Sequence, residues 1–253
     1  TVTDSSGNVS TPITTNVTID TVAPGTAPAT PASVSVPEAT NGINASEASD
    51  GVEVLVTLPS DAVAGDVITV SIDGGTPVTH TVTAAEVAAI STPITVTLPQ
   101  SAISAAGEGA ATITTTVTDS SGNVSTPITT NVTIDTTPPT AGTISLSNFT
   151  DSGSNTTDNI SNDNTFDLTI SGNEAGSTVV YQISTDGGVT WTTTTANQSA
   201  ITDGTYSFRA TVTDSAGNSA TTPVQSVTID TTPPSATVNI TAISTDSGTA
   251  GDF

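Results

Sequence analysis

A 21-residue segment that occurs twice without a change most constrains how this chain can fold. Residues 1–21 read TVTDSSGNVSTPITTNVTIDT, and residues 116–136 repeat them. A diverged third copy, TVTDSAGNSATTPVQSVTIDT, occupies residues 211–231. Each copy leads into a Pro-containing segment, so the Asp before its last Thr marks the end of a repeating unit. These residues are Asp20, Asp135 and Asp230.

The spacing of the copies indicates the size of that unit. The successive end positions 20, 135 and 230 are 115 and 95 residues apart. Such periods are too long for a solenoid turn or a propeller blade, and they match one complete β-sandwich domain. Short alternating runs between Gly, Asp, Asn and Ser clusters predict strands. In the second domain these are 142–148, 165–171, 178–184, 189–195, 205–213 and 219–229. We expect an all-β fold of tandem immunoglobulin-like β-sandwich domains joined end to end.

The repeats also predict domain boundaries. Residues 21–135 and 136–230 would be whole sandwiches, and residues 1–20 the last hairpin of a preceding one. Residues 231–253 would open the next domain, because TDSGTAGDF near the end echoes TDSGSNTTDN at 150–159. We therefore expect an internal segment of a longer protein.

Within the longer first domain, two Ala-rich segments predict short helical turns that bridge strands. They are AAEVAAI at 84–90 and PQSAISAAG at 99–107. The DGG triplets at 73–75 and 186–188 predict hairpin turns, because Gly readily adopts the positive φ angles that tight turns require.

The charge balance restricts the partners of the chain. Arg209 is the one cation among Lys and Arg, against 24 Asp and Glu, which gives a net charge of −23. Nucleic acids and anionic membranes are disfavoured, because both require Lys or Arg to neutralise phosphate. A chain this acidic repels itself unless a cation compensates. Without Cys, a metal would be held by oxygen, which favours calcium.

The expected topology gathers carboxylates at the domain junctions. With strands lettered A to G, the A–B and C–C′ loops lie beside the end of strand G, and the F–G hairpin lies at the opposite pole. In the second domain the first pole would carry Asp151, Asp158, Asp163, Asp186 and Asp230. In the first domain it would carry Glu38, Asn41, Asn44, Glu47, Asp50, Asp73 and Asp135. The F–G hairpins of the two domains would bring Asp119 with Asn123, and Asp214 with Asn218, to meet Asp20 and Asp135.

Turn chemistry competes with calcium as the reason for these acids. Asp, Asn, Gly and Ser are ordinary turn residues, which accounts for any single Asp. The recurrence of the acids in three copies, together with the absence of Lys, favours calcium at each junction. The start of the next repeat adds the candidates Asp246 and Asp252. No EF-hand loop or Gly-rich nonapeptide repeat sharpens the choice of ligands.

The segments VTDSAGNSAT, VTIDTTPP, STDGGVTW and DSGTAGDF resemble the bacterial immunoglobulin-like extender repeats of giant adhesins. Those are the type I-secreted RTX and biofilm-associated adhesins. The resemblance covers essentially the whole chain, most specifically 116–253. It implies a calcium-rigidified extracellular spacer on the surface of a Gram-negative bacterium, projecting a distal adhesive region for adhesion or biofilm formation. The implied partners are calcium and the neighbouring repeats of a monomeric chain.

The resemblance also implies particular ligands. These are Asp135 and Asp230 of the linkers, Asp158 and Asp163 of the A–B loop, and Asp119 and Asp214 of the F–G hairpins. The first domain departs from the pattern, with EATNGINASEASDG where the second has DSGSNTTDNISND. Its site uses Glu47 and Asp50 or is absent.

Other functions have less support in the sequence. His80 is the one histidine, so a Ser-His-Asp set would require it. A partly exposed strand residue is the simpler interpretation, and we expect no enzyme. The aromatic residues Trp191, Tyr181, Tyr206 and Phe208 lie on predicted strands, where we expect them in the core. The alternative function is a module in which one domain directly binds glycan, protein or ice.

Overall fold

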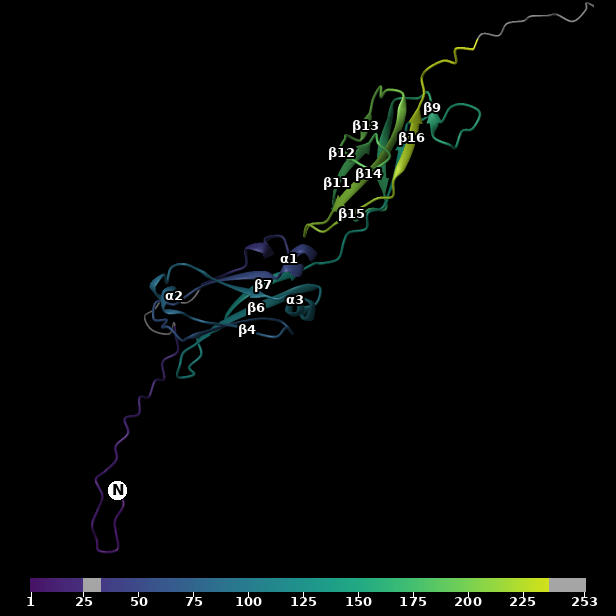
Figure 1. The fold of residues 1–253 in the computed structure, drawn as a ribbon. Helices are drawn as coiled ribbons and strands as arrows, with labels where there is room; N and C mark the ends of the chain where they lie inside the picture. The colour runs from purple at the N-terminus through teal and green to yellow at the C-terminus, as the bar shows by residue number, and fades with distance from the viewer. Residues whose placement is uncertain (25–32, 237–253) are drawn as a thin grey trace, which may run out of the picture. The chain divides into compact units, whose positions relative to one another are not determined.

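The chain folds into two compact units, each built mainly of β-strands (Figure 1). A computed structural model describes residues 1–24 and 33–236. The first unit comprises residues 1–139 together with the segment 213–219, and the second comprises residues 140–212 and the chain from Ala220 onward. The prediction of an all-β fold is confirmed.

The first unit is a sandwich of two antiparallel sheets. One sheet has the order β1-β2-β5 and the other β4-β3-β6-β7. The strands are β1 (Ser33–Ser35), β2 (Val52–Thr57), β3 (Val67–Ile72), β4 (Val78–Thr81), β5 (Ile94–Leu98), β6 (Gly109–Thr118) and β7 (Ile128–Ile134). Alternate residues of β2 and β3 are buried and form the core between the sheets. This core contains no aromatic residue, because residues 1–139 include no Phe, Tyr or Trp.

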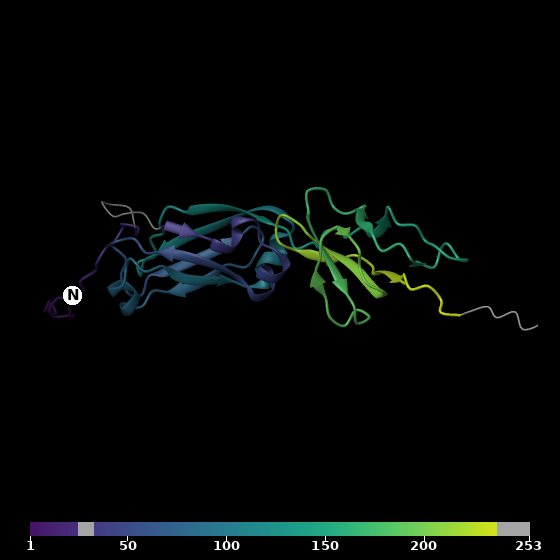
Figure 2. The ribbon, with the colours of Figure 1, turned by 90° about the horizontal axis from the view of Figure 1, so that it is seen from above.

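Short helices lie at both ends of this sandwich (Figures 1 and 2). The Ala-rich segments form α2 (Ala84–Ala88) at one end and α3 (Gln100–Ala106) at the other, as predicted. The sequence did not predict the 3-10 helix η1 (Pro37–Thr40) or the helix α1 (Ala45–Asp50), which fill the expected A–B loop. Asn44 and Glu47 form a capping box at the start of α1. The acids of this segment therefore lie on helical turns, where Glu47 is engaged as a cap.

The second unit has the strand order of an immunoglobulin sandwich. One sheet is β13-β10-β8, and the other is β12-β11-β14-β16-β9, with β15 paired to β14. The strands are β8 (Thr143–Ser147), β9 (Ile160–Ser161), β10 (Phe166–Ser171), β11 (Thr178–Ser184), β12 (Thr192–Thr193), β13 (Asn197–Gln198), β14 (Gly204–Thr213), β15 (Ser219–Thr221) and β16 (Gln225–Ile229).

The core of the second unit is aromatic. The rings of Phe166 and Phe208 meet edge-on with centroids 5.8 Å apart, and Phe149 meets Phe166 in the same way at 5.5 Å. The hydroxyl of Tyr206 donates to the carbonyl oxygen of Thr202 at 2.9 Å. This bond is the tyrosine corner of immunoglobulin-like sandwiches.

Several strand predictions for the second unit need correction. The predicted run 189–195 contains only the two-residue strand β12, and the run 219–229 is interrupted between β15 and β16 at a segment that contains Pro223, which has no N–H for a ladder. The two-residue strands β9 and β13 were not predicted. Trp191 lies outside any strand and outside the core, with the Arg209 guanidinium 4.2 Å from its ring centroid. The Trp191 ring therefore stacks against a cation and does not occupy the expected core position.

Candidate functional site

Both units place the A–B segment beside the end of their last strand. In the second unit β9 pairs parallel with β16, and the Asp230 N–H donates to the Ser161 carbonyl oxygen at 2.9 Å. In the first unit Ile43 forms a parallel bridge with Ile134, and the Asp135 N–H donates to the Ile43 carbonyl oxygen at 3.0 Å. Each terminal Asp therefore has its backbone fixed against the A–B segment of its own unit.

The side chain of each terminal Asp makes the same local contact in all three copies. Oδ1 accepts a hydrogen bond from the backbone N–H two residues later, which belongs to Val22, Thr137 or Thr232. These N···O distances are 3.0, 3.3 and 3.1 Å. From the residues that the structure describes, Oδ2 of Asp135 and of Asp230 accepts no hydrogen bond. Each of these linkers thus offers one uncommitted carboxylate oxygen to a hard cation.

The Asp of the F–G hairpin is engaged by its own turn, again three times over. Oδ1 of Asp119 accepts from the backbone N–H groups of Ser121 and Asn123, and its Oδ2 accepts from the Asn123 side chain at 2.8 Å. These donors lower the pKa of Asp119, with the Asn123 amide the largest cause. Asp4 and Asp214 accept equivalent bonds. The repeated DSSGN and DSAGN sequences therefore build a rigid turn.

At two of the three hairpins the Asn, and not the Asp, reaches a terminal Asp. Asn123 Nδ2 donates to the Asp20 carbonyl oxygen at 3.2 Å. Asn218 lies in the segment 213–219, which belongs to the first unit. Its Nδ2 donates to the Asp135 carbonyl oxygen at 2.7 Å. Asn218 is only 7% exposed, and its Oδ1 accepts from the Ala45 N–H at 2.9 Å. The side chain therefore links the hairpin tip to the terminal Asp and to the start of α1.

In the second unit, the A–B loop forms a hollow of about 410 Å³. Asp158 and Asp230 both line it, so two predicted ligands come to one place. Asp151 lies in the same loop, where its Oδ2 accepts from the Asn159 N–H and its Oδ1 is buried without a hydrogen bond. Asp163 is more fully engaged, accepting the N–H groups of Thr150 and Thr165.

The two acids of the C–C′ turns are held by other contacts. Asp186 accepts bonds from Ser184, Val189 and Thr190, and these donors, led by the Thr190 hydroxyl, hold its pKa far below the usual range. Asp73 accepts from the Thr112 N–H at 2.8 Å. Gly74 and Gly187 have the positive φ angles of 72° and 75° that the DGG triplets predicted.

The remaining predicted ligands are dispersed. Glu47 accepts from the Asn44 N–H, and Asp50 is exposed at the last turn of α1. Asp246 and Asp252 lie outside the described residues. Across residues 1–24 and 33–236, no three acids or His come close enough together to hold a metal by themselves. A calcium ion at a linker would need Asn side chains, backbone carbonyls or water to complete its oxygen shell.

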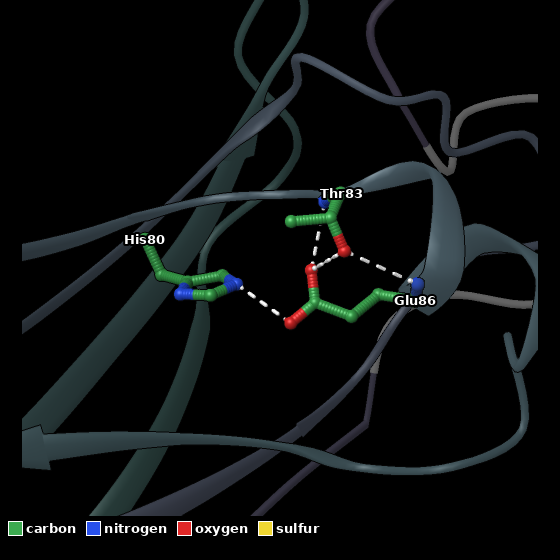
Figure 3. A network of polar contacts seen from close by, with 3 residues as sticks. All are labelled: His80, Thr83 and Glu86. Atoms are coloured by element: carbon green, nitrogen blue, oxygen red, sulfur yellow. Dashed lines mark hydrogen bonds and ion pairs between the residues drawn. The ribbon is translucent and has the colours of Figure 1, made fainter.

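His80 belongs to a helix cap (Figure 3). Its Nε2 lies 2.9 Å from Glu86 Oε1. Glu86 Oε2 accepts from the Thr83 N–H and hydroxyl, and the Thr83 hydroxyl oxygen in turn accepts from the Glu86 N–H. These bonds, with the Thr83 N–H the largest cause, lower the pKa of Glu86. The arrangement is the capping box that starts α2.

Two acids that the sequence reasoning did not single out contact the linkers. Glu108 and Asp203 each stand immediately before a Gly at the start of β6 and β14, and both accept hydrogen bonds from linker Thr residues. The signal was present in the alignment of the copies, since EGAATITTTVTDSSGN at 108–123 matches DGTYSFRATVTDSAGN at 203–218.

A comparison with protein families finds one family model that matches the second unit. Residues 138–231 match the family model described as the bacterial Ig-like domain. This segment is therefore similar to bacterial Ig-like domains. The likeness inferred from the sequence is confirmed for this segment, and the strand order of the second unit agrees with it. The strands of the first unit follow the corresponding order in its two sheets. The first unit has no tyrosine corner, because Ala111 stands at the position of Tyr206 and the helix α3 precedes it.

Three similar solved structures come from two bacterial adhesins and a large adhesion protein. One, described as a Ca²⁺-stabilised adhesin that helps an Antarctic bacterium reach out and bind ice, is 25% identical with a TM-score of 0.49, over 78% of this chain and 48% of that one. A 1.5-MDa bacterial ice-binding adhesin is 23% identical with a TM-score of 0.46, over 78% and 63%. A tetra-tandem repeat from the extending region of a large adhesion protein is 23% identical with a TM-score of 0.29, over 79% and 49%.

The chain spans less than two thirds of the length of each of these structures. No curated protein sequence shows significant similarity to it. Among the described helices, none has the length and apolar character needed to cross a membrane.

Proposed function

We propose that the chain is a spacer segment of a large bacterial cell-surface adhesin, stiffened by calcium at the linkers between its sandwiches. It would hold a distal adhesive region away from the cell and would perform no catalysis. The domains would follow the repeats, with whole sandwiches at 21–135 and 136–230. The location would be extracellular, after type I secretion from a Gram-negative bacterium.

The observation that carries the proposal is the repeated geometry of the terminal Asp. Oδ1 is engaged in a local turn in all three copies, and the backbone N–H is held at Asp135 and Asp230. The equivalent hairpin Asn donates to the carbonyl oxygen of Asp20 and of Asp135. The uncommitted carboxylate Oδ2 at Asp135 is the kind of oxygen donor that calcium prefers. Turn formation alone requires only one of the two carboxylate oxygens.

Charge gives independent support to the cation. A net charge of −23 with a single Arg makes close approach of repeating acidic segments unfavourable at low ionic strength. A divalent cation at each linker lowers that repulsion and restrains the chain on either side of it. Extracellular modules with oxygen-only sites typically bind calcium at about 10⁻⁴–10⁻³ M, which suits a protein outside the cell.

Calorimetric titration of calcium into the whole chain tests this proposal. We expect saturable binding that weakens at least about tenfold when Asp135→Ala removes the free oxygen at one linker, a loss of about 1.4 kcal/mol. Asp167→Asn is the matched control, because among the described residues the Asp167 carboxylate accepts hydrogen bonds from Asn148 and Asn197 alone and contacts no linker. Absence of calcium heat in the unaltered chain, or equal binding by Asp135→Ala and Asp167→Asn, would contradict the proposal.

A further inference from the structure

The end of each last strand faces an acid across the sheet. The register pairs Gly109 of β6 with Ile134 and Gly204 of β14 with Ile229. The residues immediately before these glycines, Glu108 and Asp203, therefore stand opposite the terminal Asp residues. Both glycines have positive φ angles, 102° and 156°, which side chains other than glycine rarely allow. The acid-Gly pair thus turns the carboxylate toward the start of the linker.

The contacts made there are alike in both units. Glu108 Oε2 accepts from the Thr136 N–H at 3.0 Å, and Oε1 accepts from the Thr136 hydroxyl. Asp203 Oδ1 accepts from the Thr231 N–H at 2.9 Å and from its hydroxyl at 2.6 Å, and Oδ2 accepts from the Thr232 hydroxyl at 2.6 Å. All are charge-assisted bonds, the stronger class of hydrogen bond.

We propose that Glu108 and Asp203 are positioning residues, each clamping the first linker residue to its own sandwich so that the terminal Asp is oriented before any cation binds. The clamp completes a two-sided restraint. On one side the N–H of Asp135 or Asp230 is held by Ile43 or Ser161, and on the other side the following Thr is held by the clamp. Between these points the peptide has little freedom to turn its carboxylate away.

Two features argue that the clamp is a device and not an incidental surface contact. Unlike side chains, Glu in one unit and Asp in the other, reach the equivalent Thr by the same backbone N–H and hydroxyl pair. The Asp203 carboxylate also makes three such contacts at once, and these donors, led by the Thr231 hydroxyl, lower its pKa. Because linker N–H and hydroxyl groups already donate to the Asp203 carboxylate, this residue can hold the linker without a metal.

The clamp deepens the proposed spacer function and depends on it only for the role of the terminal Asp as a calcium ligand. Without calcium, the clamp should keep the first linker residue ordered. When calcium is added, it should bind a linker that is already oriented. The calcium affinity is then higher, because binding loses less conformational entropy of the linker.

Amide hydrogen exchange at Thr231 tests the clamp in the whole chain. Thr231 belongs to the diverged copy, so its signal does not coincide with those of the identical copies. In chelator, we expect Asp203→Ala to speed its exchange about tenfold, as loss of one charge-assisted bond predicts. Asp167→Asn is the control and should leave the rate unchanged. Unaltered Trp191 fluorescence would show that each variant keeps the second unit folded.

Calcium distinguishes a positioning residue from a ligand. We expect Thr231 exchange in the unaltered chain to stay slow after calcium is added, and calcium affinity to fall several-fold in Asp203→Ala. Equal exchange in the unaltered chain and Asp203→Ala without calcium would overturn the proposal, as would faster Thr231 exchange on adding calcium. If the chain binds no calcium but Thr231 is protected in chelator, the calcium function fails and the clamp stands.

Discussion

Asp66 provides the sharpest stability prediction, because it is an acid buried without full compensation. The residue lies between β2 and β3 and is 1% exposed. Its Oδ2 accepts from the Val63 N–H at 2.9 Å, whereas Oδ1 is buried and has no hydrogen-bond partner. Burial is the largest cause that raises the pKa of Asp66, and the charges of Asp119 and Asp61 add to it.

The sign of the pH effect follows from that raised pKa. The folded chain holds the Asp66 proton more tightly than the unfolded chain, so stability rises as pH falls through the folded pKa. At pH 7 the ionised carboxylate is destabilising. Asp66→Asn keeps one oxygen for the Val63 N–H and removes the charge, although its amide nitrogen still lacks an acceptor. We expect a net gain of about 1 kcal/mol at pH 7, or about 4 °C in the melting temperature of a domain of this size.

The aromatic residues make the assay specific. Because residues 1–139 contain none, Trp191 fluorescence reports only the second unit. Calorimetric melting in chelator should therefore show a transition without a fluorescence change, which belongs to the first unit and should move upward in Asp66→Asn. The difference from the unaltered chain should shrink as pH is lowered toward 4. A variant that is less stable at pH 7, or a difference that does not change with pH, would refute the reasoning.

Three further variants test the packing. Phe166→Ala should destabilise the second unit by about 3–5 kcal/mol, measured by denaturant melting of Trp191 fluorescence, and an unchanged midpoint would contradict the assigned core. Arg209→Ala should cost about 0.5–2 kcal/mol and shift the Trp191 emission, since it removes the cation over the ring, whereas an unshifted spectrum would argue against the contact. Gly51→Ala should destabilise the first unit by more than Gly65→Ala in calorimetry. Both glycines have positive φ angles, but an added Cβ meets β5 atoms at 2.8 Å only at Gly51, so equal losses would argue against that close approach.

The sequence predicted most of the fold because its strongest signals are local. The DGG triplets, the repeated hairpins and the Ala-rich helical turns each depend on a few neighbouring residues whose conformational preferences agree with the final structure. The sandwich order followed from the repeat length and from the connection rules of a seven-stranded topology.

The errors arose where tertiary contacts decide the structure. The helix α1 was taken for a loop because its turn-forming residues, Asn44 among them, serve equally well as helix caps. Trp191 was expected in the core from a predicted strand, but its ring is stacked beneath Arg209, 18 residues away in the sequence. Neither outcome follows from local preferences alone.

The sequence predicted where the candidate site lies better than it predicted the hydrogen bonds of each acid. Topology correctly predicted that the A–B segment lies beside the terminal Asp. Which acids remain free to bind a cation depends on hydrogen-bond geometry that the sequence does not reveal. In the structure, Asp119, Asp186 and Asp214 accept hydrogen bonds within their own turns. The contacts of Glu108 and Asp203 with the linkers depend on cross-strand register, so they could be recognised only after the strands were paired.

Small-angle scattering of the whole chain with and without calcium tests the central claim most directly. If cations at the linkers stiffen a string of sandwiches, calcium should yield a profile that fits one extended shape, and chelator should yield the broader distribution of maximum dimensions expected of a flexible linker. Asp135→Ala should remain flexible in both conditions. Identical profiles for the unaltered chain in calcium and in chelator would contradict a calcium-stiffened spacer.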